Sequence, residues 1–168
     1  YTGRSGFAGE FGHTIVEAGG RPCPCGNRGC IEQYASEPAI LREYAELACL
    51  SSPTVDDLIA DYRRQSPPAV SAIRTFTKYM AIAINNIATI FNPDIIIINS
   101  SFTSYLPDII PMIQERLSRA QAAAASQSHP ASDKFCPLIP STLQDTAILL
   151  GGAAVCIRDF LGIQSLRL

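Results

Sequence analysis

Charge is scarce in this 168-residue sequence, and neither sign dominates. Charged residues make up 17% of the chain, and 13 Lys and Arg stand against 15 Asp and Glu. The resulting net charge of −2 gives no cationic surface for holding nucleic acid directly. We therefore expect any contact with DNA to be made by a domain that is not in this chain.

Long uninterrupted apolar runs are also missing. Lys78, Asn85 and Asn86 interrupt the most hydrophobic region, so no membrane span and no membrane partner are expected. Residues 1–6 are polar and glycine-rich, which is not the pattern of a secretory leader. These features favour a cytoplasmic protein, in which thiols stay reduced.

Hydrophobic residues make up 47% of the chain, enough for one domain with a sizeable core. Apolar residues recur at helical spacing in several segments, and two short apolar runs between turn residues are candidate strands. We expect helices at residues 31–48 (interrupted at Glu37-Pro38), 55–64, 69–91, 107–120 and 145–161, and strands at residues 94–99 and 135–140. Because helices and strands alternate, the fold class is expected to be α/β.

Three local features carry further expectations. The four isoleucines at 95–98 are typical of a parallel strand buried on both faces by helices. Gly151 and Gly152, near the start of the last helix, indicate a place where the backbone approaches another group closely. The Ala/Ser/Gln-rich stretch 122–133 is expected to be a surface loop or a frayed helix end, with His129 exposed.

The six cysteines fall into two groups. Three are scattered and are expected to behave as small buried hydrophobes: Cys49, Cys136 and Cys156. The other three follow His13 within the segment 13–30: Cys23, Cys25 and Cys30. One imidazole and three thiolates form a complete tetrahedral zinc shell, and four protein ligands leave no open position, so such a zinc would be structural.

A disulfide, or thiols that are merely buried, is the alternative for this cluster. A disulfide across Cys-x-Cys is strained, and a reducing compartment disfavours it. However, Cys-x-Cys-x₄-Cys is not the common spacing of zinc ligands, so the spacing leaves the alternative open.

Residues 9–14, Gly-Glu-Phe-Gly-His-Thr, and 23–32, Cys-Pro-Cys-Gly-Asn-Arg-Gly-Cys-Ile-Glu, closely resemble the signature of the ROK family. That family comprises bacterial sugar repressors, open-reading-frame products and sugar kinases. The resemblance continues through residues 91–97 and ends in Gly-Gly-Ala-Ala at 151–154, so it spans nearly the whole chain.

The resemblance implies a fold and a set of site residues. Residues 1–168 would be the carboxy-terminal lobe of an actin-like ATPase fold (ribonuclease H-like, hexokinase-type), incomplete at its start. The amino-terminal lobe and a DNA-binding head would lie outside the chain, and residues 13–30 would form a structural zinc loop. In the family, zinc is held at the positions of His13, Cys23, Cys25 and Cys30. Sugar hydroxyls are bound at the positions of Glu10, His13 and Glu32.

The branch of the family decides between a regulator and an enzyme. Kinases of the family usually place a glycine pair directly after the isoleucine-rich strand, where backbone amides approach the nucleotide. Residues 99–102 read Asn-Ser-Ser-Phe instead, and this departure resembles the repressor branch, of the xylose-repressor and NagC type.

The first hypothesis is therefore the sugar-sensing effector domain of a transcriptional regulator, with no catalytic residues assigned. Its partners would be a sugar or sugar derivative and a second copy of itself. The alternative is the carboxy-terminal lobe of a sugar kinase that transfers phosphate from ATP to a hexose. A degenerate fragment that acts only as an interaction module is a third interpretation, because a sheet that lacks its first strands leaves an edge open for pairing with another chain.

Overall fold

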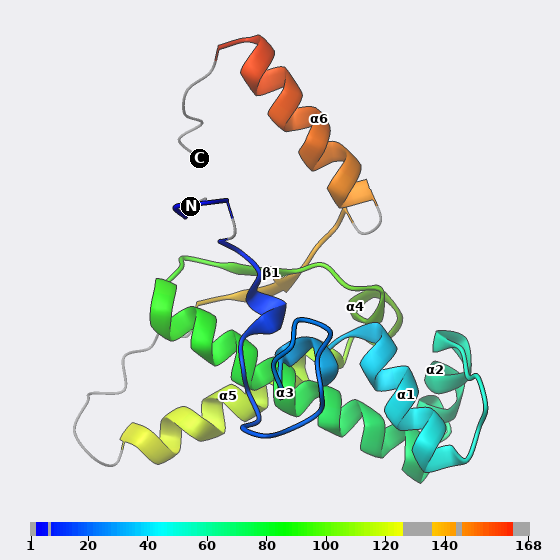
Figure 1. Cartoon of the computed structure of the whole chain (residues 1–168). Coiled ribbons are helices and arrows are strands. Elements are labelled where there is room, and N and C mark those ends of the chain that lie inside the picture. Colours follow the sequence, from blue (N-terminus) through cyan, green and yellow to red (C-terminus); the bar gives the residue numbers. More distant parts are fainter. Residues whose placement is uncertain (1–2, 7, 126–135, 144–145, 163–168) are drawn as a thin grey trace.

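The computed structural model describes residues 3–6, 8–125, 136–143 and 146–162 (Figure 1). Two one-turn 3₁₀ helices come first, η1 (Phe11–His13) and η2 (Ile31–Gln33). The helices and strands that follow are α1 (Glu37–Ala48), α2 (Val55–Arg63), α3 (Pro67–Phe91), β1 (Ile96–Ile98), α4 (Ser101–Tyr105), α5 (Ile109–Ala125), β2 (Leu138–Pro140) and α6 (Ala147–Phe160). His129 and residues 126–133 of the expected loop lie outside the described residues, whereas residues 122–125 belong to α5.

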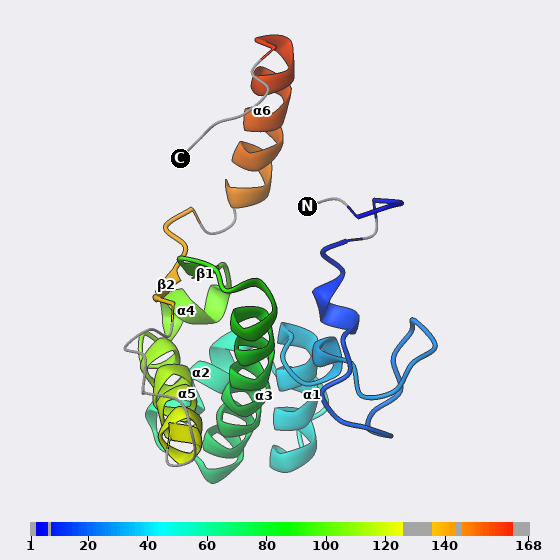
Figure 2. The ribbon, with the colours of Figure 1, turned by 90° about the vertical axis from the view of Figure 1, so that its left-hand side faces the viewer.

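Helix α3 is the centre of the lobe: α1 and α5 lie on opposite sides of it, and α2 packs against it as well (Figure 2). The buried residues of α3 extend over more than half of its length. They are Ala69, Ala72, Ile73, Phe76, Thr77, Tyr79, Ala81, Ala83 and Ile84. The helix begins with a proline in its first turn and ends where Asn92 takes a left-handed conformation, φ 42°. The expected interior helix at 69–91 is confirmed.

Side-chain caps explain where the two neighbouring helices begin. The Ser36 hydroxyl accepts a hydrogen bond from the backbone N–H of Ala39 at the start of α1. Thr54 and Asp57 form a reciprocal capping box at the start of α2. The expected helix at 55–64 is confirmed, and so is the expected break at Glu37-Pro38, because α1 begins at Glu37 with Pro38 in its first turn.

Strands β1 and β2 form a parallel pair, with Ile96 opposite Leu138 and Ile98 opposite Pro140. Ile98 and Leu138 belong to the hydrophobic core, whereas the Ile97 side chain between them is 59% exposed. The expectation that this strand is buried on both faces is therefore wrong for the described residues, because helices cover only one face of the pair there.

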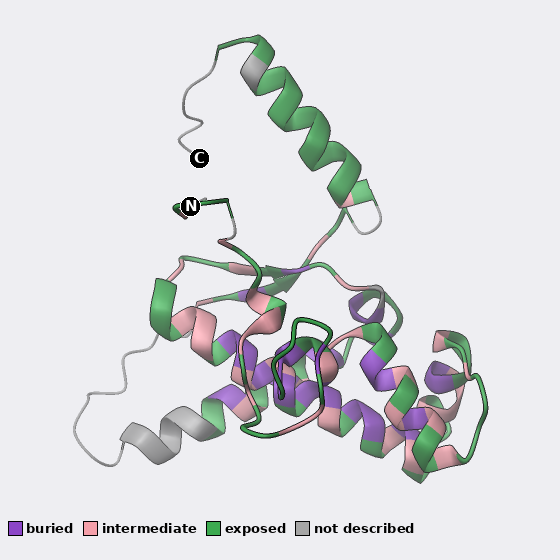
Figure 3. Ribbon diagram, in the orientation of Figure 1, coloured by how far each residue is buried: buried purple, intermediate pink, exposed green. Residues whose placement is uncertain are grey.

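Helix α6 stands away from the other helices, and its described residues after Ala147 are exposed (Figures 1 and 3). A side-chain carbon built on Gly151 or Gly152 would meet nothing within 4 Å, so none of the described residues makes the expected close approach to this backbone. The expected burial of the scattered cysteines is also wrong, since Cys49 and Cys156 are exposed and Cys136 is half-buried. None of the helices in the described ranges is long and apolar enough to cross a membrane.

Candidate metal centre

A single loop between the two 3₁₀ helices builds the candidate site. His13 ends η1, and Cys30 immediately precedes η2, which carries Glu32. Two isolated antiparallel bridges, Ile15 with Cys30 and Pro22 with Arg28, fold the loop back on itself. This fold-back returns the last cysteine to the histidine although 17 positions separate them in the sequence.

Glycine is required at the tightest point of this fold-back. Gly29 is buried at φ +84°, a conformation that L side chains rarely adopt, and a side-chain carbon there would overlap the carbonyl oxygen of Glu17. The Gly29 carbonyl accepts hydrogen bonds from the backbone N–H groups of Val16 (2.8 Å) and Glu17 (3.2 Å). The two halves of the loop can therefore lie this close only because Gly29 has no side chain.

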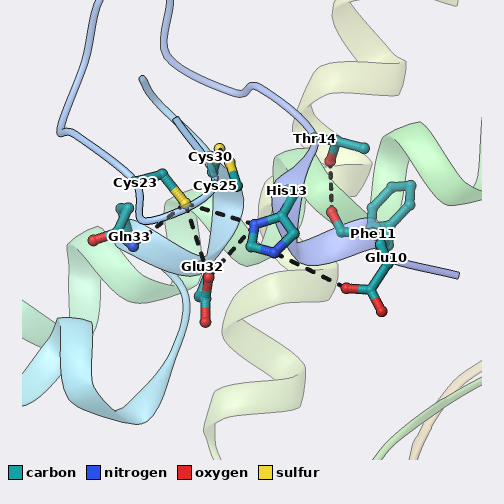
Figure 4. Close-up of polar contacts among 9 residues, drawn as sticks. All are labelled: Glu10, Phe11, His13, Thr14, Cys23, Cys25, Cys30, Glu32 and Gln33. Carbon is teal, nitrogen blue, oxygen red and sulfur yellow. Dashed lines mark hydrogen bonds and ion pairs between the residues drawn. The ribbon is translucent and has the colours of Figure 1, made fainter. Parts of the chain in front are cut away.

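The four expected metal ligands come together in one cluster. One ligand atom from each of His13, Cys23, Cys25 and Cys30 lies within 4.8 Å of the others. His13 Nδ1 is 3.6 Å from Cys23 Sγ, and the Sγ atoms of Cys25 and Cys30 are 3.6 Å apart (Figure 4). Tetrahedral zinc with ordinary bond lengths would place nitrogen and sulfur about 3.6 Å apart and two sulfurs about 3.8 Å apart. The donor set and these two distances fit zinc.

The pKa values of the clustered thiols are also shifted by their neighbours. Burial, together with hydrogen bonds and charge from the thiols of Cys23 and Cys25, raises the pKa of Cys30 to about 12. Hydrogen bonding from the backbone of Asn27, and then from the Cys23 thiol, lowers the pKa of Cys25. Thiolates at this spacing would repel one another, and a bound divalent cation would offset that repulsion.

The three expected sugar-binding residues lie beside the cluster. His13 is set between two carboxylates: Glu32 Oε2 is 3.6 Å from its Nδ1, and Glu10 Oε2 is 4.0 Å from its Nε2 (Figure 4). The side chains of Glu10 and Glu32 are 69% and 49% exposed, so a ligand can reach both. The structure brings these residues together, and their role in binding sugar stays a prediction.

A second polar network around the loop was not expected. The Arg21 guanidinium donates to Glu43 Oε2 at 2.8 Å and to the Gln33 carbonyl at 2.9 Å. The Tyr79 hydroxyl donates to Glu17 Oε2 at 2.8 Å. These partners are far apart in the sequence and form no local motif, so no pattern of spacing could have identified them.

A separate cleft of about 340 Å³ lies away from the cluster, at α1 and α2. Its lining residues are Tyr44, Leu50, Ser51, Ser52, Pro53, Asp57, Ala60, Asp61 and Arg64. It includes none of the candidate site residues. The candidate site around His13 is therefore separate from this cleft.

Sequence comparison places the chain among ROK proteins. Residues 1–159 match the ROK family model. A xylose repressor from Bacillus spizizenii is 33% identical over 163 residues, which cover 97% of this chain and 40% of the repressor. The chain thus spans about two fifths of the length of this relative.

Solved structures agree on the fold. A ROK family glucokinase from Streptomyces griseus, in complex with glucose and AMPPNP, matches with a TM-score of 0.78 at 23% identity, over 92% of this chain and 53% of that chain. A ROK family transcriptional regulator, described as a homologue of the E. coli MLC protein, matches with a TM-score of 0.65 at 28% identity, over 83% of this chain and 36% of that chain. The match to about half of a glucokinase chain confirms the expected α/β lobe of an actin-like fold.

Proposed function

This chain belongs to the ROK family, and from that premise we propose that it is the sugar-sensing lobe of a transcriptional regulator with a structural zinc site. The observation that carries the proposal is the placement of His13 between Glu10 and Glu32, directly beside three clustered thiols. The 33% identity to a xylose repressor over nearly the whole chain favours a regulator.

Zinc would be held by His13, Cys23, Cys25 and Cys30, and it would supply charge neutralisation and crosslinking rather than an open catalytic position. With Nδ1 of His13 turned toward the thiols, Nε2 is the ring nitrogen left to carry a proton. The cluster joins η1 to the segment that leads into η2. Glu10 and Glu32 would therefore be held at a fixed separation on either side of the imidazole.

The chemistry of these three side chains suits a polyhydroxyl ligand. Each carboxylate can accept hydrogen bonds from two neighbouring hydroxyl groups, and the imidazole N–H can donate to a hydroxyl oxygen. The exposed carboxylates leave room for a small sugar or sugar derivative to approach. The name of the xylose repressor makes D-xylose the first sugar to test.

The turn after β1 supports the regulator over the kinase. The Ser100 hydroxyl accepts a hydrogen bond from the Phe102 N–H, and Phe102 is buried against Phe76 with ring centroids 5.5 Å apart. Side chains and a cap hydrogen bond thus occupy the turn in which a phosphate-binding loop would need free backbone amides.

A regulator of this design would act by a population shift. Sugar bound at Glu10, His13 and Glu32 would favour one closure between this lobe and an amino-terminal lobe outside the chain. That closure would change the spacing of DNA-binding heads, also outside the chain, in a homo-oligomer. The exposed Ile97 face and the two-stranded sheet offer a surface for such assembly.

The second candidate is a lobe of a sugar kinase, favoured by the TM-score of 0.78 to a glucokinase solved with glucose and AMPPNP. In that case the same carboxylates would hold the hexose, and ATP would bind at another part of the complete enzyme.

One experiment separates the two candidates. The full-length protein is analysed for zinc and titrated calorimetrically with D-xylose, D-glucose and ATP, alongside Glu32→Gln and the control Glu37→Gln on α1. We expect about one zinc per chain, sugar binding without ATP binding, and loss of sugar binding only in Glu32→Gln. ATP binding with phosphorylation of D-glucose would replace the regulator with the kinase.

A further inference from the structure

The four candidate ligands all belong to the same loop, residues 13–30. A bound metal therefore closes the loop on itself, but it makes no bond to the helices that form the body of the lobe. The hydrophobic core cluster of the described residues likewise contains no member of this loop. Other contacts must fix the position of the loop, and with it the position of Glu32, relative to the body.

One such contact runs from the loop to α1. The Arg21 guanidinium pairs with Glu43 Oε2 at 2.8 Å, and the two side chains are only 32% and 15% exposed. The same guanidinium donates to the Gln33 carbonyl in η2 at 2.9 Å and lies 4.7 Å above the Tyr34 ring. Arg21 therefore links the loop, η2 and α1 through three different contacts. Its limited exposure makes the ion pair stronger than an ordinary surface pair.

A second contact runs from the loop to α3. The Tyr79 hydroxyl donates to Glu17 Oε2 at 2.8 Å, and the Tyr79 ring packs on Tyr34 with centroids 4.3 Å apart. Both tyrosines are 6% exposed. Burial and the Glu17 carboxylate raise the pKa of Tyr79 to about 12, so the hydroxyl keeps its proton and donates throughout the neutral range.

Glu17 connects Tyr79 to the segment that carries the Glu32 carboxylate. Its backbone N–H donates to the Gly29 carbonyl, and Gly29 precedes Cys30, which enters η2. Glu32 is the central residue of η2. A shift of Glu17 away from α3 would therefore displace the segment that carries Glu32.

We propose that Glu43 and Tyr79 are positioning residues, which act through Arg21 and Glu17 to hold the Glu32 carboxylate of the sugar site against α1 and α3 independently of the metal. This inference rests on the proposed function for its link to sugar, although the anchoring itself does not depend on it. Neither residue is a metal ligand or a sugar-binding residue. They set where the loop lies, while the metal cluster sets how the loop is folded.

The chain offers a matched control for Tyr79. Tyr44 is also a buried tyrosine, 1% exposed, and its hydroxyl donates to Asp61 Oδ2 at 2.7 Å. That bond joins α1 to α2, away from the loop. Tyr79→Phe and Tyr44→Phe each remove one hydroxyl that donates to a carboxylate and keep the ring. Both variants therefore share any general loss of stability. A difference between them in hydrogen exchange of the loop measures the effect of the Tyr79 contact on the loop.

For the contact between Arg21 and α1, Glu43→Ala is compared with Glu46→Ala, an exposed glutamate on the same helix.

The test uses the zinc-loaded full-length protein with three readouts: zinc content, amide hydrogen exchange of peptides covering residues 14–31, and calorimetric titration with D-xylose and D-glucose. We expect Tyr79→Phe and Glu43→Ala to keep their zinc. Exchange of the loop should become faster, and the binding sugar should be held about tenfold more weakly. Tyr44→Phe and Glu46→Ala should match the wild type in loop exchange and sugar affinity.

Each outcome decides a separate claim. Loop exchange in Tyr79→Phe equal to that in Tyr44→Phe overturns the anchoring, whatever the sugar result. Faster loop exchange with unchanged sugar affinity overturns the positioning role and leaves the proposed function intact. If the wild type binds neither sugar, the proposed function fails on its own, and hydrogen exchange still decides whether these two residues anchor the loop.

Discussion

Replacing Gly29 by alanine should damage the metal site through the backbone alone. Gly29 lies at φ +84°, where an L residue is strained by about 1–2 kcal/mol. The added carbon would also overlap the carbonyl oxygen of Glu17, and moving backbone to relieve such an overlap adds about 1–3 kcal/mol. The total of about 2–5 kcal/mol corresponds to zinc affinity weaker by a factor of about 30 to several thousand, at 1.36 kcal/mol per tenfold.

Gly26→Ala is the control for this prediction. Gly26 also has a positive φ, +92°, but a side-chain carbon there would meet nothing within 4 Å. Gly26→Ala should therefore cost only the backbone strain of about 1–2 kcal/mol, which weakens zinc affinity by a factor of about 5 to 30. The assay is competition for zinc against a chromophoric chelator, with helix content followed by circular dichroism. Equal zinc affinities in the two variants would refute the argument from the Glu17 overlap.

Three further predictions follow from the same geometry. Cys23→Ser should release zinc and abolish any sugar response while α1–α3 stay helical, because the core cluster includes no residue of the loop; normal zinc content together with a normal response would contradict the site. Zinc affinity should rise with pH, because the pKa of Cys30 near 12 means that metal binding displaces a proton; calorimetry in buffers of different ionisation enthalpy measures the protons released, and none released would oppose this account. Tyr44→Phe should lower the free energy of unfolding by about 1–3 kcal/mol, because Asp61 loses a buried donor; denaturant unfolding checks it, and an unchanged midpoint would count against the bond.

Local sequence signals predicted the helices well, because the interactions that begin and end a helix join residues only a few positions apart. Ser36 and Thr54 cap helices through bonds to residues only three positions away. Asn92 ends α3 in the left-handed conformation and is followed at once by Pro93. The metal-ligand cluster was predictable for a related reason, since its four members lie within 18 positions and carry donor atoms that few other residues supply.

The wrong predictions concern burial, which depends on residues far away in the sequence. Four isoleucines in a row predict a buried strand, yet whether Ile97 is covered depends on what packs over the sheet, and nothing described here does so. The same reasoning applies to Cys156 on α6, whose apolar neighbours give no information about exposure. Helix α4 was missed because its five residues, capped by Ser100, are too few to show a periodicity.

The candidate site contains one part that a local motif predicts and one part that depends on residues far away in the sequence. Its metal ligands form a motif because one ion must be reached by four atoms of a single short loop. Its anchors, Glu43 and Tyr79, form none, because any pair of helices that passes the loop could supply a carboxylate and a hydroxyl at many alternative positions. A motif match can therefore identify the loop but cannot establish that the loop is correctly placed for binding. A chain with the complete ligand set but without these two side chains should bind metal normally and bind sugar weakly, and the matched variants distinguish these two properties.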